Sequence, residues 1–220
     1  MLMAGESEAE VANTSFERFG GFCALAAGPT GFAYSLAFVL YLHHPSRGAA
    51  YADDVLLLVG ALLSTAALTA LYERLRATDP GLALWGYVLG IAGALAAALH
   101  GAYDLANLVK PPAQLAADLP SAVDPRGIGT FALTALAFAA VGLLIVRGRR
   151  LPVGLGYLAL VSAALLAVVY VGRLVILNPK SPGLLTAAVI TGFVTNPIWY
   201  VWVGLVLTRA DRPVPVPALP

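Results

Sequence analysis

The chain has 220 residues, of which 60% are hydrophobic and only 11% are charged. Soluble domains carry about 25% charged residues, so this composition excludes an ordinary soluble protein and favours an integral membrane protein. The formal net charge is +1 and no basic patch alternates with aromatic residues, which excludes a nucleic-acid-binding protein.

A short acidic lead at residues 1–15, which we expect to be flexible, precedes six apolar runs. These predicted spans cover residues 20–42, 55–75, 82–108, 128–146, 152–177 and 184–208. In a bilayer, backbone groups must pair within their own helix or in a closed barrel, and runs of about 20 residues without alternation indicate helices. The sequence therefore predicts an all-α bundle of six transmembrane helices over residues 16–209. A Pro-rich tail at 210–220 should be disordered.

Basic residues are divided unequally between the two sides of the predicted membrane. One side takes Arg18, Arg74, Arg76, Arg147, Arg149, Arg150, Arg209 and Arg212, and the other takes Arg47, Lys110, Arg126 and Lys180. Cytoplasmic loops are enriched in Lys and Arg, so the first side should be cytoplasmic. Both termini should then lie in the cytoplasm, which agrees with an even number of spans.

The third predicted span carries the most informative pattern. Its small and polar residues are spaced by three or four, so they share one helix face: Gly86, Gly90, Gly93, Ala97, His100, Asp104 and Asn107. The small half is typical of a close contact between membrane helices. The polar half, with Tyr103 beside it, indicates a binding site for a small molecule or an ion towards the outer surface.

The fifth predicted span supplies a charge at a matching depth. Arg173 and Asp104 lie at nearly equal distances from the cytoplasmic ends of their helices, so the simplest arrangement pairs them and places Tyr170 near His100. Charged residues inside spans are commonly paired and functional. The predicted ligand-binding residues are therefore His100, Tyr103, Asp104, Asn107, Tyr170 and Arg173. The alternative is a structural ion pair or an interfacial anchor.

Prolines interrupt two predicted spans near their middle. Pro29 lies in the first span, and Asn196 and Pro197 lie in the sixth. Proline removes a helix donor and clashes with the carbonyl four residues earlier. Transporters use such breaks to bind ions or substrates, whereas the alternative is a kink whose carbonyls bond to nearby hydroxyl groups.

The sequence lacks the common motifs of enzymatic chemistry. It contains no Walker loop, no dinucleotide-binding glycine pattern, no His-Glu-x-x-His pair and no Gly-x-Ser-x-Gly elbow. It therefore assigns no catalytic residue and no cofactor. His43, His44, Asp53 and Asp54 fall on the same membrane side as His100, so a zinc site remains a further hypothesis, although no ligand motif specifies one.

Three stretches look familiar: His100 to Asn107, Asp124 to Gly127, and Asn196 to Trp202. Together they resemble a group of uncharacterised six-span bacterial membrane proteins, a domain of unknown function. The resemblance covers most of the chain. It implies the same architecture and a bacterial plasma membrane, and it implies no catalytic role for any residue.

These observations predict a multi-pass protein of a bacterial inner membrane with an outward-facing polar pocket for a small ligand or a transported solute. The alternative is a non-catalytic accessory or scaffold subunit, docked in a larger membrane complex through the glycine face of the third span. A metal-binding redox subunit is a third hypothesis. The expected partners are the lipid bilayer, a small molecule or ion, and other membrane subunits.

Overall fold

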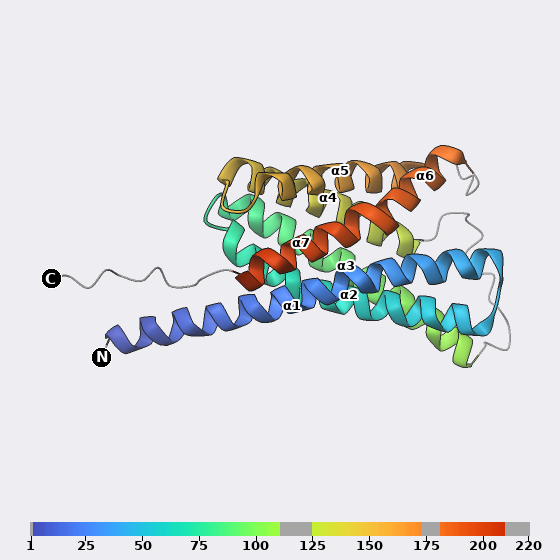
Figure 1. Cartoon of the computed structure of the whole chain (residues 1–220), viewed down its shortest axis with the longest axis horizontal. Helices are drawn as coiled ribbons and strands as arrows, with labels where there is room; N and C mark the ends of the chain where they lie inside the picture. The colour runs from blue at the N-terminus through green and yellow to red at the C-terminus, as the bar shows by residue number, and fades with distance from the viewer. Residues whose placement is uncertain (1, 111–124, 173–180, 210–220) are drawn as a thin grey trace.

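The computed structural model describes residues 2–110, 125–172 and 181–209, and within these ranges all regular structure is helical. Figure 1 shows the helices in chain order. They are α1 (Leu2–His43), α2 (Arg47–Leu75), α3 (Pro80–Val109), α4 (Pro125–Gly148), α5 (Val153–Val171), α6 (Pro182–Ile190), the π-helix η2 (Thr191–Thr195) and α7 (Asn196–Arg209). The last three follow one another directly and form a single span.

Six segments of the described chain are long and apolar enough to cross a membrane. They are Ser15–His43, Arg47–Leu75, Pro80–Val109, Gly129–Gly148, Val153–Val171 and Pro182–Arg209. This confirms the prediction of an all-helical chain with six such helices. The observed helix α1 begins at Leu2 and so includes the lead that we expected to be flexible. The predicted tail and the end of the fifth predicted span lie outside the described residues.

Local sequence explains where the helices begin. The Ser46 side chain accepts a hydrogen bond from the Ala49 amide at 3.1 Å, which caps α2. Asp79 caps α3 in the same way, accepting from the Leu82 amide at 3.0 Å. Pro80 follows as the first residue of α3, where its missing N–H costs nothing. These caps fix the turns between α1 and α2 and between α2 and α3.

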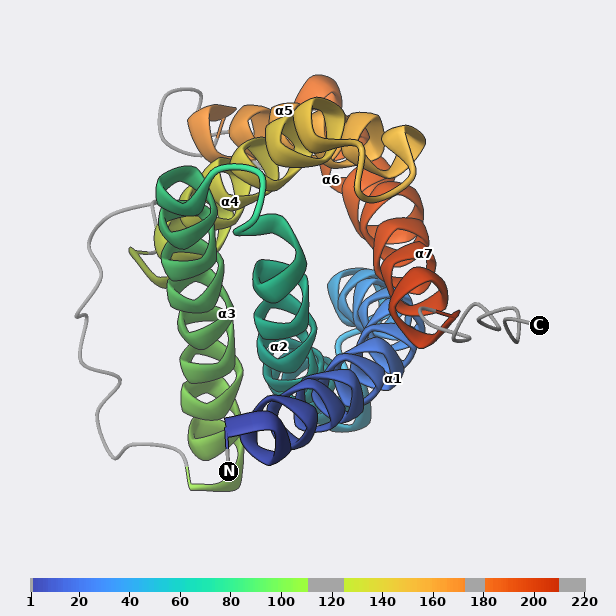
Figure 2. The ribbon, with the colours of Figure 1, turned by 90° about the vertical axis from the view of Figure 1, so that its left-hand side faces the viewer.

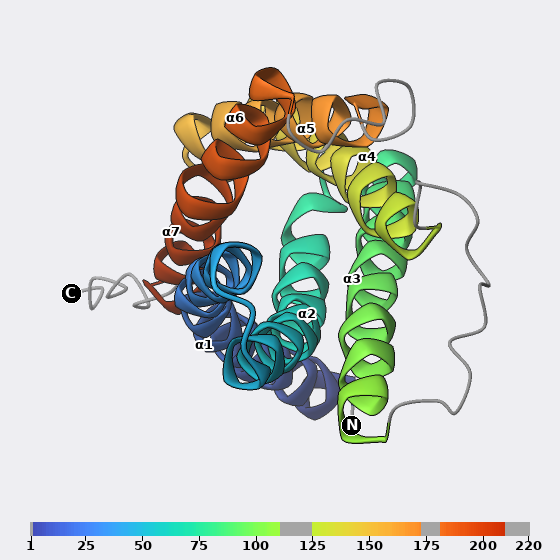
Figure 3. The same cartoon turned by 90° about the vertical axis from the view of Figure 1, so that its right-hand side faces the viewer.

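The helices form a closed ring when seen along the bundle, as Figure 2 and Figure 3 show from opposite ends. Each helix packs against the next one in the chain, and α7 returns to pack against α1. The start of α1 and the end of α7 therefore lie at the same end of the bundle (Figure 1). We call this the arginine end, because Arg18, Arg74, Arg76, Arg147, Arg149, Arg150 and Arg209 lie there.

Glycines close the ring between α1 and α7. A Cβ placed on Gly28 would lie 2.8 Å from the carbonyl oxygen of Pro197, and one on Gly204 would lie 2.7 Å from the carbonyl oxygen of Gly21. No side chain fits at such distances, so the two helices meet backbone to backbone. Buried apolar side chains of α2, α4, α5 and α7 fill the interior beside this contact.

Candidate functional site

Acidic side chains and a histidine gather where α2 meets α3, at the end of the bundle opposite the arginine end. His100 Nε2 lies 3.1 Å from Asp104 Oδ2, one helical turn along α3. Asp53 and Asp54 of α2 lie within electrostatic range of both residues. We call these four residues, Asp53, Asp54, His100 and Asp104, the α2–α3 cluster. It combines three carboxylates with one imidazole.

Close backbone packing brings the two helices together at this cluster. A Cβ on Gly101 would lie 2.7 Å from the carbonyl oxygen of Asp54, so only glycine allows this approach. Nearer the helix ends, Arg47 Nη2 and the Tyr51 hydroxyl both donate to the Leu108 carbonyl, at 3.1 and 3.3 Å. These contacts fasten the beginning of α2 to the end of α3 and hold the cluster between them.

The cluster extends from a buried position to an open one. Asp54 is buried, and Asp53 Oδ1 is also buried, with no hydrogen-bond partner among the described residues. The side chains of His100 and Asp104 are 24% and 36% exposed. Both helices are about 44 Å long and a hydrocarbon core is about 30 Å thick, which places the cluster near the edge of the core. A ligand from the aqueous side could therefore reach it.

The charge of the cluster favours cations. Carboxylates accept hydrogen bonds and cannot donate them, and three of them outweigh a single imidazole. Among the described residues, no three His, Cys, Asp or Glu side chains converge as the ligands of a metal ion would. The zinc hypothesis, which also invoked His43 and His44, thus has no geometric support. The arrangement fits an organic cation, which donates its N–H groups to the carboxylates or lays its positively charged surface against them.

The structure places the predicted site residues in different surroundings. Tyr103 lies beside the His100–Asp104 pair and is 56% exposed, and Asn107 lies one turn further along α3 and is half-buried. Tyr170 is half-buried on α5, and α4 separates α5 from α3 (Figure 2). Arg173 lies outside the described residues, so its pairing with Asp104 stays a prediction.

The glycine face of α3 is covered by the chain itself. A Cβ on Gly86 would lie 2.8 Å from Ala140 Cβ, and one on Gly93 would lie 2.6 Å from the Thr134 hydroxyl. Both neighbours belong to α4. The predicted close helix contact is therefore present, and it is internal. The hypothesis of an accessory or scaffold subunit stays a prediction.

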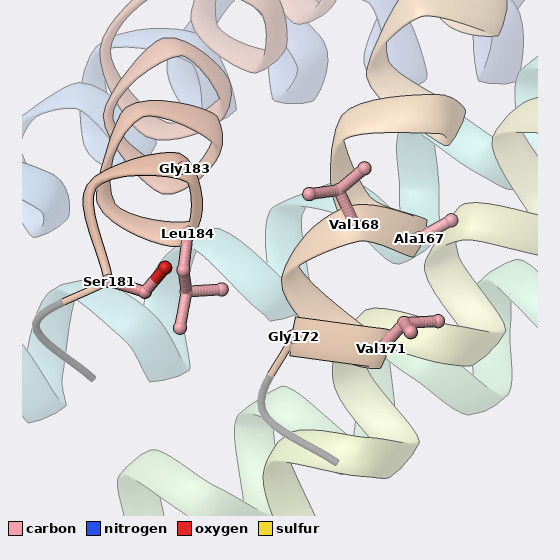
Figure 4. Close-up of a pocket in the computed structure, with 7 residues that line it drawn as sticks. All are labelled: Ala167, Val168, Val171, Gly172, Ser181, Gly183 and Leu184. Carbon is pink, nitrogen blue, oxygen red and sulfur yellow. The ribbon is translucent and has the colours of Figure 1, made fainter. Parts of the chain in front are cut away.

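A groove lies between the end of α5 and the beginning of α6, well away from the α2–α3 cluster. The volume of the groove is about 420 Å³. Its lining is apolar apart from one hydroxyl group (Figure 4). The lining residues are Ala167, Val168, Val171, Gly172, Ser181, Gly183 and Leu184. Of the predicted ligand-binding residues that the structure describes, none contributes to it, and its described surface suits a hydrocarbon group better than a polar ligand.

The two proline positions behave differently. Helix α1 runs through Pro29 without interruption, and the neighbouring Thr30 hydroxyl donates to the Ala26 carbonyl at 2.8 Å. In the sixth span, α-helix changes to π-helix at Thr191 and returns at Asn196, directly before Pro197. The sixth span thus contains an irregular turn, whereas the first does not.

No protein-family model, curated protein or solved structure matches this chain. The resemblance to the six-span bacterial group therefore stays a prediction.

Sequence reasoning identified part of the cluster and misjudged the rest. The spacing of His100 and Asp104 signalled their shared face. From the sequence, Asp53 and Asp54 enter only the zinc hypothesis, although two adjacent carboxylates inside an apolar helix are themselves a signal of function. Ser162 was not singled out, yet it is fully buried in α5 with no partner for its hydroxyl among the described residues. A lone serine in an apolar run carries no such signal.

Proposed function

We propose that the protein is a multi-pass protein of a bacterial inner membrane that binds a small organic cation at the α2–α3 cluster. An ammonium or guanidinium group would bind there, as the ligand itself or as part of a transported solute. The observation that carries this proposal is the gathering of three carboxylates, including the unpartnered Asp53 oxygen, at the edge of the membrane core. Ionisable groups at such depth are costly and are usually retained for function.

The chemistry of the cluster supports this class of ligand. An ammonium group offers N–H donors to carboxylate oxygens, which cannot satisfy one another. The exposed ring of Tyr103 lies beside the face of α3 that carries His100 and Asp104, where it can meet a cation through its π surface. An anionic ligand would need positively charged side chains where this cluster has carboxylates.

The orientation of the bundle supports binding from outside the cell. Arginines concentrate at the arginine end, whereas the opposite end holds Arg47 and Lys110 among its described side chains. By the positive-inside rule, the arginine end with both termini is cytoplasmic. The cluster then opens to the periplasmic side.

Binding of choline and of guanidinium to the full chain in lipid nanodiscs tests the proposal, with isothermal titration calorimetry as the readout. We expect at least one of the two cations to bind. Asp53→Asn and Asp104→Asn should each weaken binding by about tenfold, because each removes a charge-assisted contact of about 1.5 kcal/mol. Glu73→Gln, which changes a carboxylate at the arginine end, should leave affinity unchanged.

Further titrations separate the competing outcomes. Sodium acetate should give no signal, because its anion is repelled by the cluster. If neither cation binds, or if binding survives the double variant Asp53→Asn/Asp104→Asn, the proposal is wrong and the cluster is a structural ion pair. Binding of zinc alone, lost in His43→Gln/His44→Gln, would instead support the metal hypothesis.

A further inference from the structure

The sixth span changes its helix type in the middle of the membrane. In η2 the backbone hydrogen bonds join residues five apart instead of four apart, so the Asn196 amide donates to the Thr191 carbonyl. Thr195 lies 13 residues after Pro182 and 14 before Arg209, which places it about 20 Å from either end of the span. The π-helical turn is therefore at the centre of the bilayer, far from the α2–α3 cluster.

Three polar atoms lie unpaired at this turn. Thr195 is 5% exposed and Trp199 is 1% exposed, so both side chains are in the protein interior. Thr195 Oγ1, Asn196 Oδ1 and Trp199 Nε1 have no hydrogen-bond partner in the part of the chain that the structure describes. Thr195 and Trp199 are one helical turn apart, and thus lie on the same face of the span. We call these three residues the η2–α7 polar site.

Two other hydroxyl groups of the helical interior are satisfied by carbonyls of their own helices. The Thr191 hydroxyl donates to the Ala187 carbonyl at 2.7 Å. The Ser64 hydroxyl donates to the Ala61 carbonyl at 2.7 Å. Pro197 has no N–H, so it cannot donate to a carbonyl of the preceding turn, whether four or five residues earlier. The turn thus combines one N–H donor, two side-chain acceptors and a freed carbonyl within a short distance along the chain.

The composition of the site determines what it can bind. Residues 182–208 contain no Asp, Glu, Lys or Arg, so the site is neutral. The centroids of the Phe138 and Trp199 rings are 4.6 Å apart, so the Phe138 ring covers one side of the Trp199 ring. A ligand must therefore be uncharged, small, and able both to donate and to accept. Buried water has these properties and commonly makes about three hydrogen bonds to otherwise unsatisfied groups.

We propose that the η2–α7 polar site binds water at the centre of the membrane. A water molecule accepts a hydrogen bond from Trp199 Nε1 and donates to Thr195 Oγ1 and to Asn196 Oδ1. Unpaired polar groups in hydrocarbon are costly, and one bound water satisfies several of them together. The π-helical turn has a role in this arrangement, because it exposes backbone acceptors that a regular α-helix would occupy. This inference is independent of cation binding at the other site.

Water-edited solid-state NMR tests the proposal on the full chain in lipid vesicles, with nitrogen-15 in the tryptophan indoles. Signals are assigned with Trp85→Phe and Trp202→Phe. We expect polarisation to pass from water to the Trp199 indole N–H despite its burial. Absence of transfer to Trp199 at mixing times where the exposed Trp85 is fully polarised would overturn the proposal.

Variants at the hydroxyl group separate bound water from other sources of the signal. Thr195→Val keeps the side-chain shape and should abolish or strongly reduce the transfer to Trp199, whereas Thr195→Ser should retain it. Thr208→Val is the matched control, because the Thr208 hydroxyl donates to the Gly204 carbonyl of its own helix. An unchanged signal in Thr195→Val, with the protein folded, would also overturn the proposed site.

Discussion

Gly101 sets the distance between the two helices that hold the α2–α3 cluster. Its missing side chain lets the Asp54 carbonyl approach α3, so the carboxylates of α2 lie beside the His100–Asp104 pair. A larger residue at 101 would separate the helices and spread the charges apart. Both the stability of this helix contact and the geometry of the cluster thus depend on the absence of a side chain at residue 101.

Gly101→Ala should destabilise the folded protein by about 1–3 kcal/mol, because the new Cβ meets backbone atoms that cannot rotate away. Gly31→Ala is the control, since a Cβ at Gly31 has no other atom within 4 Å. Equilibrium unfolding in mixed micelles with increasing dodecyl sulfate measures both. Equal stability of the two variants would show that α2 and α3 are not in close contact at Gly101.

Sequence alone could locate some of these residues and not their neighbours. The spacing of His100 and Asp104 fixes their shared helix face, because the helical period is known. Whether Asp53 lies towards that face depends on how α2 is rotated against α3. That rotation is set by the contact at Gly101, which involves residues distant in the chain. The same limit applies to Tyr170, whose helix is separated from α3 by α4.

At the scale of helices, one ion pair joins α1 to α2 near the arginine end. Arg74 Nε and Nη2 donate to the two carboxylate oxygens of Glu17, at 2.8 and 3.2 Å. Both side chains are largely buried, at 20% and 15% exposure. A paired guanidinium and carboxylate of this geometry resists solvent screening better than an exposed pair does. The pair therefore fixes the position of α1 along the axis of α2.

Glu17→Gln should lower the free energy of unfolding by about 1 kcal/mol, because it removes the charge from this two-point contact. Glu73→Gln should cost only a few tenths of a kcal/mol, because Glu73 pairs with the exposed Arg76 within a single helix. Thermal unfolding of the purified protein at low salt compares the two variants. A larger effect for Glu73→Gln would contradict this ranking.

The sequence locates the helices but not the start of each one. The apolar runs predict starts at residues 82, 128, 152 and 184, within three residues of the observed starts at Pro80, Pro125, Val153 and Pro182. Helices α1 and α2 begin earlier than predicted, at Leu2 and Arg47 instead of residues 20 and 55. The π-helical turn was predictable only as a break near Pro197, since proline signals a missing donor but not the way the chain accommodates it. The close packing of Gly28 of α1 against the Pro197 carbonyl, between residues distant in the chain, is likewise not readable from the sequence.

At the scale of the whole molecule, the ring of helices has two chemically different ends. Arginines occupy one end and the α2–α3 cluster lies near the other. Because the number of spans is even, the start of α1 and the end of α7 lie at the same end of the bundle (Figure 1). The orientation of the protein in the membrane therefore determines which compartment the cluster faces.

Cysteine labelling of intact bacteria tests this orientation in a Cys23→Ala background. Gly48→Cys, at the end that carries the cluster, should react with a membrane-impermeant maleimide. Ala77→Cys, in the turn between α2 and α3, should react only after the membrane is permeabilised, because the proposed orientation places the arginine end in the cytoplasm. Both positions are exposed in the fold. The reverse labelling pattern would place the cluster inside the cell.

The contact between α1 and α7 also bears on how the protein is made. The ribosome delivers α1 to the membrane first and α7 last, yet each provides the surface against which the other rests, at Gly28 and Gly204. During synthesis, the glycine-bearing side of α1 has no helix of its own chain to cover it. Lipid or the insertion machinery must occupy that side until α7 has been inserted. The ring can consequently close only after its last helix has entered the membrane.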